Sequence, residues 1–356
     1  MEKRDVCHRA EMPQSERLGG VGSISPEDGA SGVNDVKVVI ANWNGKKFLS
    51  QVLEALRHQT FKRFSTLIVD NGSTDGSLDL ISVHFPEVDI LPLERNIGFS
   101  AANNLAIKSV SQEYIALLNN DAVPHPGWLQ SLVDSLRRHP QAAIAASKML
   151  FFDFPGVIDR AGDGYTTSGT GLLRGRGEAA ERFENTEWVF GACAGAALFR
   201  TSLFHDVGLF DEDFFLIYED VDLNFRAQLK GYKCLYVPDA IVYHKGGMTI
   251  GHDSPVSVYY GHRNLEWVYI QNMPGHLIRR TVFNHLLYDV AAFFYFAAIG
   301  RHWEFLRAKW DALKGLKRAL SKRGKIQREN RVSHEYIWSL LENEALLSRL
   351  VRKFHK

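Results

Sequence analysis

Cysteine is scarce in this chain of 356 residues, and the three cysteines, Cys7, Cys193 and Cys234, are far apart. An odd number of widely spaced cysteines provides neither a disulfide framework nor a Cys-x-x-Cys metal motif, which favours a reducing compartment. Long apolar runs are missing as well, since no segment reaches the roughly 18–20 apolar residues of a membrane-spanning helix. Residues 1–34 lack the apolar core of a signal peptide, and we expect them to be a disordered leader.

Charge of one sign and several catalytic motifs are also absent. The 42 Lys and Arg residues nearly balance the 41 Asp and Glu residues, which argues against a general nucleic-acid binder. No H-E-x-x-H, G-x-S-x-G or G-x-x-x-x-G-K-[ST] pattern occurs, so zinc hydrolases, nucleophile-elbow hydrolases and P-loop enzymes have no support. The G-T-G-L-L-R-G run beginning at Gly169 does not have the spacing of a dinucleotide-binding loop.

Short apolar segments alternate with helical patterns through the first half of the chain. Strands are predicted at 36–41, 65–70, 114–118 and 142–146, and helices lie between them. This alternation predicts a parallel, doubly wound α/β sheet, in which ligands bind beyond the carboxyl ends of the strands. Asp70 and Asp121 both stand at such ends, which makes them the first candidate site residues.

The middle of the chain changes character. The glycine-rich segment 151–187 predicts a hairpin or a mobile loop, and the small residues of 188–199 predict a tightly packed strand. A helix is expected from about 221 to 230, ending at Gly231, followed by strands at 233–237 and 240–243. We therefore expect a leader (1–34), one large domain (35–275) and a helical, amphipathic and basic tail (276–356).

The tail combines an apolar segment with a basic one. Leu286–Ile299 is too short to cross a bilayer and is interrupted by Asp289. The next segment, 301–330, places aromatic residues at helical spacings among many cations, namely Lys314, Lys317, Arg318, Lys322, Arg323, Lys325 and Arg328. This composition predicts a helix pair at a membrane surface. The alternative is a helical subdomain that covers the acceptor cleft or forms a dimer contact.

Four polar positions suggest chemistry, and each has a plainer interpretation. Asp70 can accept from the N3–H of uracil or thymine, or it can simply form a turn. Asp121, in Asn119-Asn120-Asp121, can bind a divalent cation or cap a helix. The acids of Glu219-Asp220-Val221-Asp222 exceed what helix capping needs, so one of them can serve as a base. His244 can be a ligand or a structural residue.

Taken in order, V-V-I-A-N-W-N-G, I-V-D-N-G-S-T-D-G-S, R-N-I-G-F-S-A-A-N-N, L-L-N-N-D-A and Y-E-D-V-D-L-N-F-R resemble a family 2 glycosyltransferase of the GT-A fold. The bacterial rhamnosyltransferase-like branch is the most similar, including its Y-Y-G-H-R-N segment (Tyr259–Asn264). The resemblance covers about residues 36–270 and implies a doubly wound mixed sheet with a helical C-terminal appendage. It implies that Asp220 is the catalytic base, supported by Glu219, Asp222 and Arg226. The implied nucleotide-binding residues are Ala41, Asn42, Asp70, Asn96, Gly98 and Asn119.

The resemblance also implies a metal site for Mg²⁺ or Mn²⁺ at Asp121 and His244. Asn119 replaces the first Asp of the family's D-x-D motif, so one negative ligand is missing. The implied reaction is inverting transfer of a sugar from a dTDP- or UDP-sugar, with dTDP-rhamnose among the candidates. Its partners would be a glycan or polyprenyl-linked acceptor and the inner face of the cytoplasmic membrane, with no nucleic acid. The rival hypotheses are a nucleotidyltransferase of similar sheet architecture and a catalytically inactive nucleotide- or glycan-binding module.

Overall fold

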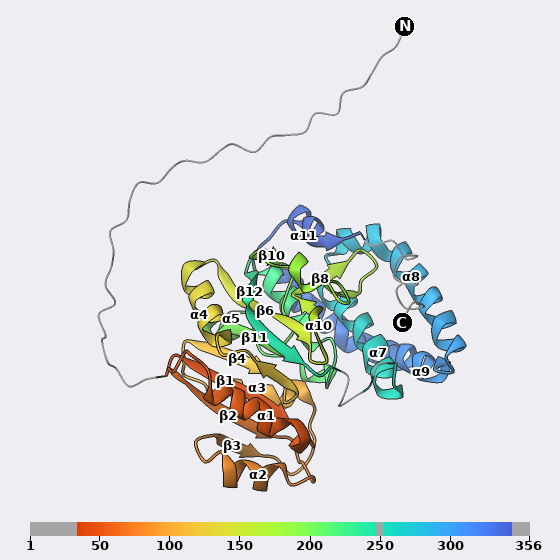
Figure 1. Ribbon diagram of the computed structural model, residues 1–356. Coiled ribbons are helices and arrows are strands. Elements are labelled where there is room, and N and C mark those ends of the chain that lie inside the picture. The colour runs from red at the N-terminus through yellow and green to blue at the C-terminus, as the bar shows by residue number, and fades with distance from the viewer. Residues whose placement is uncertain (1–33, 247–250, 252, 344–356) are drawn as a thin grey trace, which may run out of the picture. The chain divides into compact units, whose positions relative to one another are not determined.

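A ten-stranded mixed sheet is the central feature of the computed structural model, which describes residues 34–246, 251 and 253–343 (Figure 1). The expected leader lies outside the described residues except for Asn34. Across the sheet the strands are β10 (Glu187–Val189), β12 (Lys233–His244), β6 (Ala142–Phe151), β11 (Ala196–Arg200), β4 (Tyr114–Leu118), β1 (Val36–Asn42), β2 (Phe64–Asp70) and β3 (Asp89–Pro92). Two more strands join it, because β5 (Ala122–Pro124) pairs with β12 and β7 (Phe154–Ala161) pairs with β6.

The strand directions explain where polar residues gather. β1 is parallel to both β2 and β4, and Asn42 lies opposite Asp70 in the register. The carboxyl ends of these strands therefore meet at one edge of the sheet. β11 is antiparallel to both β4 and β6, so the sheet is mixed and the expectation of a purely parallel sheet is wrong. The predicted α/β class, the mixed doubly wound sheet and the helical C-terminal region are confirmed.

Helices cover both faces of the sheet, as a doubly wound fold requires. One core cluster joins the sheet to α1 (Lys46–Arg57), α2 (Ser77–His84) and α4 (Trp128–Arg138). The other joins it to α3 (Phe99–Ser109), α5 (Thr201–Val207) and α6 (Glu219–Leu229). In α1 the fully buried residues recur at helical spacing, as Leu49, Val52, Leu53 and Leu56. Burying each such side chain contributes roughly 1.5–3 kcal/mol, so this periodicity determines which face of the helix meets the sheet.

Of three local predictions, one is confirmed and two differ from the structure. Segment 151–187 is mostly ordered, and its β8 (Asp163–Thr166) and β9 (Gly171–Leu173) form an antiparallel hairpin, which confirms that part of the prediction. A short 3₁₀ helix, η1 (Ala180–Arg182), follows. The single strand expected at 188–199 is divided between β10 and β11. Conversely, 233–237 and 240–243 belong to one strand, β12, with a register shift between Val237 and Ile241 around Pro238, which has no N–H to donate.

The C-terminal helices pack against the sheet domain through a third core cluster. They are α7 (Pro255–Asn272), α8 (Gly275–Ala298), α9 (His302–Lys314), α10 (Leu316–Arg328) and α11 (His334–Leu340), and a short strand β13 (Leu341–Glu342) pairs with β8. A second short 3₁₀ helix, η2 (Glu212–Phe214), precedes α6, and its Phe214 lies in this cluster beside Trp267 of α7. Among the described residues, no helix is long and apolar enough to cross a bilayer.

Candidate active site

A polar network lies at the carboxyl ends of β1, β2 and β4. The Asn42 amide donates to Asp70 at 2.9 Å, and its oxygen accepts from the Asn120 amide at 2.9 Å. Asp70, which is 1 % exposed, also accepts from the backbone N–H of Ser73 at 3.0 Å. Ala41 precedes Asn42 on β1, opposite Val69 of β2. Three of the sequence-predicted positions, Asn42, Asp70 and Ala41, therefore lie together at this edge.

The loop before α3 is attached to the same edge. The Asn71 amide donates to Asn96 at 3.0 Å and to the carbonyl oxygen of Gly98 at 3.2 Å. Asn96 in turn accepts from the backbone N–H of Gly98 at 2.9 Å. Gly98 has φ +92°, and a Cβ there would lie 2.5 Å from the Phe215 ring, so only glycine fits. Asn96 and Gly98 thus belong to a tight loop held by Asn71, the residue after Asp70, and their nucleotide-binding role stays a prediction.

His244 lies between two carboxylates, one from the turn between β4 and β5 and the other from β7. Its Nε2 is 3.3 Å from Asp121, and its Nδ1 is 2.7 Å from Asp159 of β7, which also binds Arg176 at 2.5 Å. Burial lowers the pKa of His244, but the hydrogen bonds to Asp121 and Asp159 outweigh burial and raise it to about 9. Burial raises the pKa of Asp159, whereas His244 and Arg176 lower it, and the net result is about 2. Asp159 is therefore a firmly ionised partner that orients the imidazole.

This donor set fits a divalent cation. With a pKa of about 9, His244 keeps a proton on Nε2 toward Asp121 at neutral pH, and a divalent ion would displace that proton. Asp159 would then hold the remaining Nδ1–H, which is the carboxylate–histidine–metal arrangement of many metal sites. Asp121 supplies the hard oxygen ligand that Mg²⁺ or Mn²⁺ requires. Asn119 does not contribute a charge, and its backbone N–H donates to Gly195 at 2.8 Å. Asp121 and His244 are thus the residues that would hold the ion together with a diphosphate.

Asp220 and Glu219 begin α6 beneath this edge. The Asp220 carboxylate accepts from the backbone N–H of Ala194 at 3.2 Å, one residue before the Gly195 carbonyl that meets Asn119. Glu219 is 7 % exposed, and its Oε2 has no hydrogen-bond partner among the described residues. Burial first and the neighbouring Asp220 second raise the pKa of Glu219 to about 8.

Two further charged residues border Asp220, and the sequence analysis missed both. Arg160, in β7, donates to Asp163 at 3.2 Å. Burial raises the pKa of Asp163 to about 7, an increase that Arg160 reduces and Asp220 enlarges. The signal that was available is the pair Asp159-Arg160 inside an otherwise apolar strand, directly after Val157 and Ile158.

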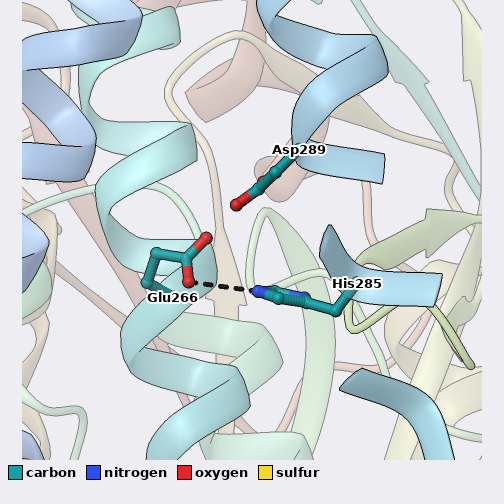
Figure 2. Close-up of side chains that lie close together, drawn as sticks. All are labelled: Glu266, His285 and Asp289. Atoms are coloured by element: carbon teal, nitrogen blue, oxygen red, sulfur yellow. Dashed lines mark hydrogen bonds and ion pairs between the residues drawn. The ribbon is translucent and has the colours of Figure 1, made fainter. Parts of the chain in front are cut away.

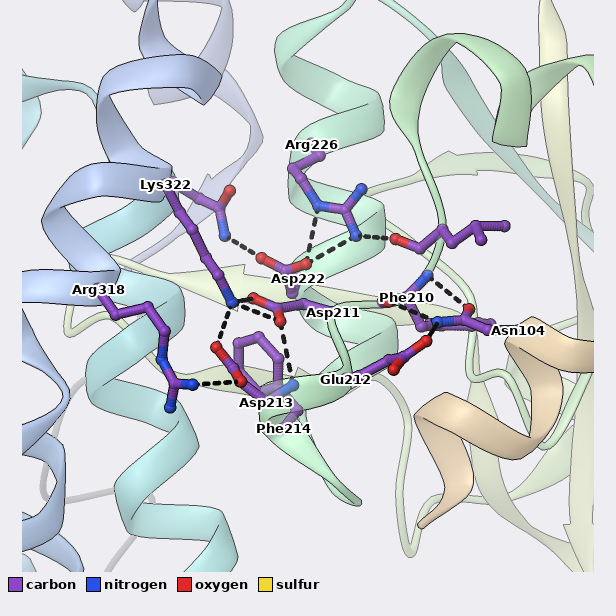
Figure 3. A network of polar contacts seen from close by, with 12 residues as sticks. Asn104, Phe210, Asp211, Glu212, Asp213, Phe214, Asp222, Arg226, Arg318 and Lys322 are labelled. Atoms are coloured by element: carbon purple, nitrogen blue, oxygen red, sulfur yellow. Dashed lines mark hydrogen bonds and ion pairs between the residues drawn. The ribbon is translucent and has the colours of Figure 1, made fainter. Parts of the chain in front are cut away.

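Asp222 and Arg226 lie on another side of α6, in the network shown in Figure 3. Asp222 is fully buried, and it accepts from Arg226 at 2.8 Å and from the Asn272 amide at 2.8 Å. Arg226 also donates to the backbone carbonyls of Val207 and Leu209, at 2.9 Å each. These partners make Asp222 and Arg226 anchors of α6 against α5 and α7.

A second carboxylate–histidine cluster lies in the C-terminal helices. Figure 2 shows Glu266 of α7 facing His285 and Asp289 of α8, with their ligand atoms within 4.8 Å of one another. The Lys309 ammonium, from α9, binds Glu266 and lies 2.6 Å from Asp289. Lys309 thus already supplies the positive charge between these carboxylates, so we assign the cluster a structural role in joining α7, α8 and α9. The interruption at Asp289 is part of this cluster.

Two cavities flank α6. The larger, about 320 Å³, lies between α5, α6 and α10 and is lined by residues that include Asp222, Arg226 and Lys322. The other, about 260 Å³, is lined by Ile217 and Tyr218 just before Glu219, and by His262, Tyr288 and Phe296 of the C-terminal helices. Neither is lined by Asp70, Asp121 or His244. The second cavity therefore lies apart from the polar network and meets α6 only through the residues that precede Glu219.

Comparisons with known proteins agree with this geometry. Residues 37–208 match the family model described as glycosyl transferase family 2. An N-acetylglucosaminyl-diphospho-decaprenol L-rhamnosyltransferase of Mycobacterium tuberculosis is 29% identical over 266 residues, which cover 65% of this chain and 83% of that protein. The O-antigen biosynthesis protein RfbC of Myxococcus xanthus is 25% identical over 243 residues, covering 64% of this chain but only 19% of that protein.

Solved structures show the same fold. GalNAc-T7 with UDP, GalNAc and Mn²⁺ superposes with a TM-score of 0.55 at 16% identity, over 67% of this chain and 48% of that one. A mannosyltransferase of Pyrobaculum calidifontis in complex with GDP-Man and Mn²⁺ gives a TM-score of 0.52 at 16% identity, over 83% and 85% of the two chains. The likeness confirms the predicted GT-A fold, and identities this low establish the fold alone.

Proposed function

Because residues 37–208 form a family 2 glycosyltransferase domain, we propose that this protein transfers a sugar from a nucleotide-diphosphate donor to a hydroxyl group of a lipid-linked glycan. One observation carries the proposal. The Asp70–Asn42–Asn120 network, the Asp121–His244 pair and the Asp220 carboxylate come from distant parts of the sequence and gather at one edge of the sheet. A nucleotide, a diphosphate and an acceptor hydroxyl each find a chemically suitable partner there.

The donor we propose is a dTDP- or UDP-sugar, and dTDP-rhamnose is the first to test. A carboxylate such as Asp70 accepts from the N3–H of thymine or uracil, whereas N3 of cytosine is itself an acceptor. Asp70 has two partners in the structure, and each of its oxygens keeps a further lone pair for the base. The rhamnosyltransferase relative, named for a decaprenol-linked N-acetylglucosamine acceptor, supports rhamnose as the sugar and a polyprenyl diphosphate as the carrier.

We assign Asp220 the role of general base, which takes the proton of the acceptor hydroxyl as its oxygen attacks the anomeric carbon. The bond to the diphosphate oxygen breaks on the opposite face, so the configuration at that carbon inverts. The Ala194 N–H holds one oxygen of Asp220 and thereby limits its rotation. A bound divalent ion, held by Asp121 and His244, would neutralise charge on the diphosphate. Asp159 keeps His244 in the orientation that binding requires.

The test is release of the nucleoside diphosphate. Purified protein is incubated with dTDP-rhamnose or UDP-sugars, with and without polyprenyl diphospho-N-acetylglucosamine, in Mn²⁺, in Mg²⁺ and in excess chelator. We expect acceptor-dependent release of dTDP or UDP that chelator abolishes and added metal restores. Release of pyrophosphate from a nucleoside triphosphate and sugar phosphate would instead indicate a nucleotidyltransferase. Binding of donor without release in any combination would indicate an inactive binding module.

We also propose that the α8–α9 pair lies on the membrane that carries the acceptor. Both helices expose large apolar side chains at helical spacing, on α8 Val282, Phe283, Leu286, Leu287, Val290 and Phe294, and on α9 Trp303, Leu306, Trp310 and Leu313. Exposed apolar surface of this kind marks an interaction site. A bilayer surface suits it because tryptophan favours the headgroup region, and the exposed cations Arg307, Lys314 and Lys317 suit anionic lipid. The protein would then be peripheral on the inner face of the cytoplasmic membrane.

The basic segment does not act as one charged surface. Arg318 binds Asp213, Lys322 binds Asp211 and Asp213, and Arg323 donates to the backbone carbonyls of Ile270 and Met273. Removing everything after Gly275 would therefore take these contacts away from the sheet domain. Point substitutions on the exposed face are the sounder test.

Co-sedimentation with anionic and neutral vesicles then tests the membrane proposal. We expect the Phe283→Glu and Trp303→Glu double variant to lose binding to anionic vesicles. The control double variant Val83→Glu and Leu105→Glu, on α2 and α3, introduces the same two charges at exposed apolar positions elsewhere and should bind like the parent. If the parent protein does not co-sediment with either kind of vesicle, and light scattering shows a dimer that the Phe283→Glu and Trp303→Glu variant abolishes, the apolar face of α8 and α9 is an interface between copies of the chain.

A further inference from the structure

The five residues before Asp220 include three with unusual backbone conformations. Phe215 has φ 65° and ψ −59°, Ile217 has φ 65°, and Tyr218 has φ 74°. Side chains with a Cβ rarely adopt positive φ, and a β-branched residue such as Ile217 does so least of all. The N–H of Leu216 donates to the carbonyl of Phe214 at 2.7 Å, which closes the rare and strained form of the γ-turn. We name residues 214–218 the strained turn.

Such a conformation persists only where the surroundings impose it. In this protein one side chain makes most of the contacts that impose the conformation of the strained turn. Asn264 of α7 is fully buried, and its amide nitrogen lies within hydrogen-bond distance of three carbonyl oxygens of the strained turn, those of Phe214 at 3.0 Å, Leu216 at 2.9 Å and Ile217 at 2.7 Å. An amide has two N–H bonds, so one of them is shared between two carbonyls.

We call the Asn264 side chain the clamp. Its neighbour in the chain, Arg263, fixes the orientation of the clamp. Its Nε donates to the Asn264 side-chain oxygen at 2.9 Å, which turns the amide nitrogen toward the strained turn. Its Nη2 donates to the carbonyls of Asp213 and Phe214, at 2.9 and 3.0 Å. The guanidinium lies over the rings of Tyr260 and Trp267, at 4.8 and 4.4 Å. Its orientation is therefore set by packing as well as by hydrogen bonds.

The strained turn touches both halves of the candidate active site. It runs directly into Glu219 and Asp220 at the start of α6. On its other side the Phe215 carbonyl accepts from the first N–H of α3, that of Phe99, at 2.7 Å, and the Phe215 ring lies against Gly98. Phe215 also stacks on Tyr260 at 5.3 Å. A displacement of the turn would thus move the base relative to the donor loop.

We propose that Asn264, oriented by Arg263, is a positioning residue that holds the strained turn and thereby sets the location of Asp220 against the donor site. This gives a role to the Y-Y-G-H-R-N segment, which the reaction itself leaves unexplained. The proposal rests on the proposed glycosyl transfer for its kinetic part only. Its structural part, the coupling between Asn264 and the strained turn, is independent of any substrate.

The kinetic test compares Asn264→Ala with Thr281→Val, using dTDP-rhamnose, polyprenyl diphospho-N-acetylglucosamine and Mn²⁺. Thr281 is also fully buried. The Thr281→Val substitution removes its hydrogen bonds to Tyr269 and to the Leu277 carbonyl, neither of which belongs to the strained turn. Displacing a catalytic group by about an ångström costs about a hundredfold, so kcat of Asn264→Ala should fall about 10- to 100-fold. KM for dTDP-rhamnose should stay within about threefold, and Thr281→Val should keep the parent kcat. An unchanged kcat in Asn264→Ala overturns the positioning role.

The structural test is a double-mutant cycle with Ile217→Gly. Glycine adopts positive φ without strain, so it should make the clamp less necessary. We expect Ile217→Gly to raise the midpoint of thermal unfolding of Asn264→Ala by about 2–4 °C more than that of the parent, and to restore part of its kcat. Strict additivity of the two substitutions in the unfolding midpoint overturns the clamp. If the parent shows no turnover with any donor, the proposed function fails, and this cycle still decides on the clamp.

Discussion

Glu219 offers a prediction that depends only on its surroundings and on no substrate. The side chain is 7 % exposed, and burial, reinforced by the adjacent Asp220, raises its pKa from 4.5 to about 8. Between these two values the folded protein keeps the proton while the unfolded chain has released it. The unfolded state therefore binds fewer protons, and the free energy of unfolding falls as the pH rises through this window. Below pH 4.5 the penalty is absent, and above pH 8 it is complete.

The Glu219→Gln variant removes this dependence, because an amide of nearly the same shape does not ionise. One proton corresponds to about 1.4 kcal/mol per pH unit, so the variant's stability relative to the parent should increase by about 2–3 kcal/mol between pH 5 and pH 7. Asp163, with its pKa of about 7, is present in both proteins and cancels in the difference to first order.

Urea unfolding at pH 5, 6 and 7 measures this difference, with circular dichroism and tryptophan fluorescence as two probes of the same transition. Asp213→Asn, at a neighbouring carboxylate that keeps 23% side-chain exposure, serves as the control for loss of a charge near the same helix. A stability difference between Glu219→Gln and the parent that does not change with pH would show that Glu219 is ionised in the folded protein. The raised pKa of Glu219 would then be wrong.

Three other predictions follow from single side chains. Asp220→Asn should lower turnover by about 10²–10⁴-fold while dTDP still protects the protein against thermal unfolding, and near-parental turnover would remove its role as base. Asp70→Ala should weaken the binding of UDP and dTDP, measured by calorimetry, by about 1–3 kcal/mol without weakening the binding of CDP. Equal losses for all three nucleotides would contradict the recognition of the nucleobase by Asp70. Lys309→Met should lower the free energy of unfolding by about 2–4 kcal/mol, because Glu266 and Asp289 lose their cation, and retained stability in urea would refute the structural role of that cluster.

The sequence predicted the parts of the fold that depend on local periodicity. The apolar spacing of α1 and the β-branched run of β1 each determine one element and the face that it buries. The position of β11 was not predictable in this way. Its residues form a small apolar segment whose partners, β4 and β6, are chosen by packing across the whole sheet. The pairing directions, and hence the mixed character of the sheet, belong to that level of organisation.

Some residues of the candidate site were predictable from the local sequence, and others were not. Asp70 and His244 were identified because each ends a strand, and Asp121 because it follows closely after the end of β4. Such positions are visible in the sequence. Asp159 was missed because its importance comes from contact with His244, 85 positions away in the chain. The charged pair Asp159-Arg160 stands out in an otherwise apolar strand, but nothing in the sequence shows that Asp159 meets His244. The orientation of the imidazole is therefore a property of the assembled sheet alone.

The basic segment shows why composition alone gave an incomplete account of the C-terminal helices. A run of cations favours a charged surface only while its members face the solvent. In α10 the Lys322 ammonium lies 2.6 Å from Asp211 and 2.5 Å from Asp213, immediately before the strained turn (Figure 3). The backbone carbonyl of Asp213 also accepts a hydrogen bond from Arg263 of α7. Helix α9, which shares the outward apolar face with α8, packs against α7 and α10, and these two helices hold the segment that precedes Asp220.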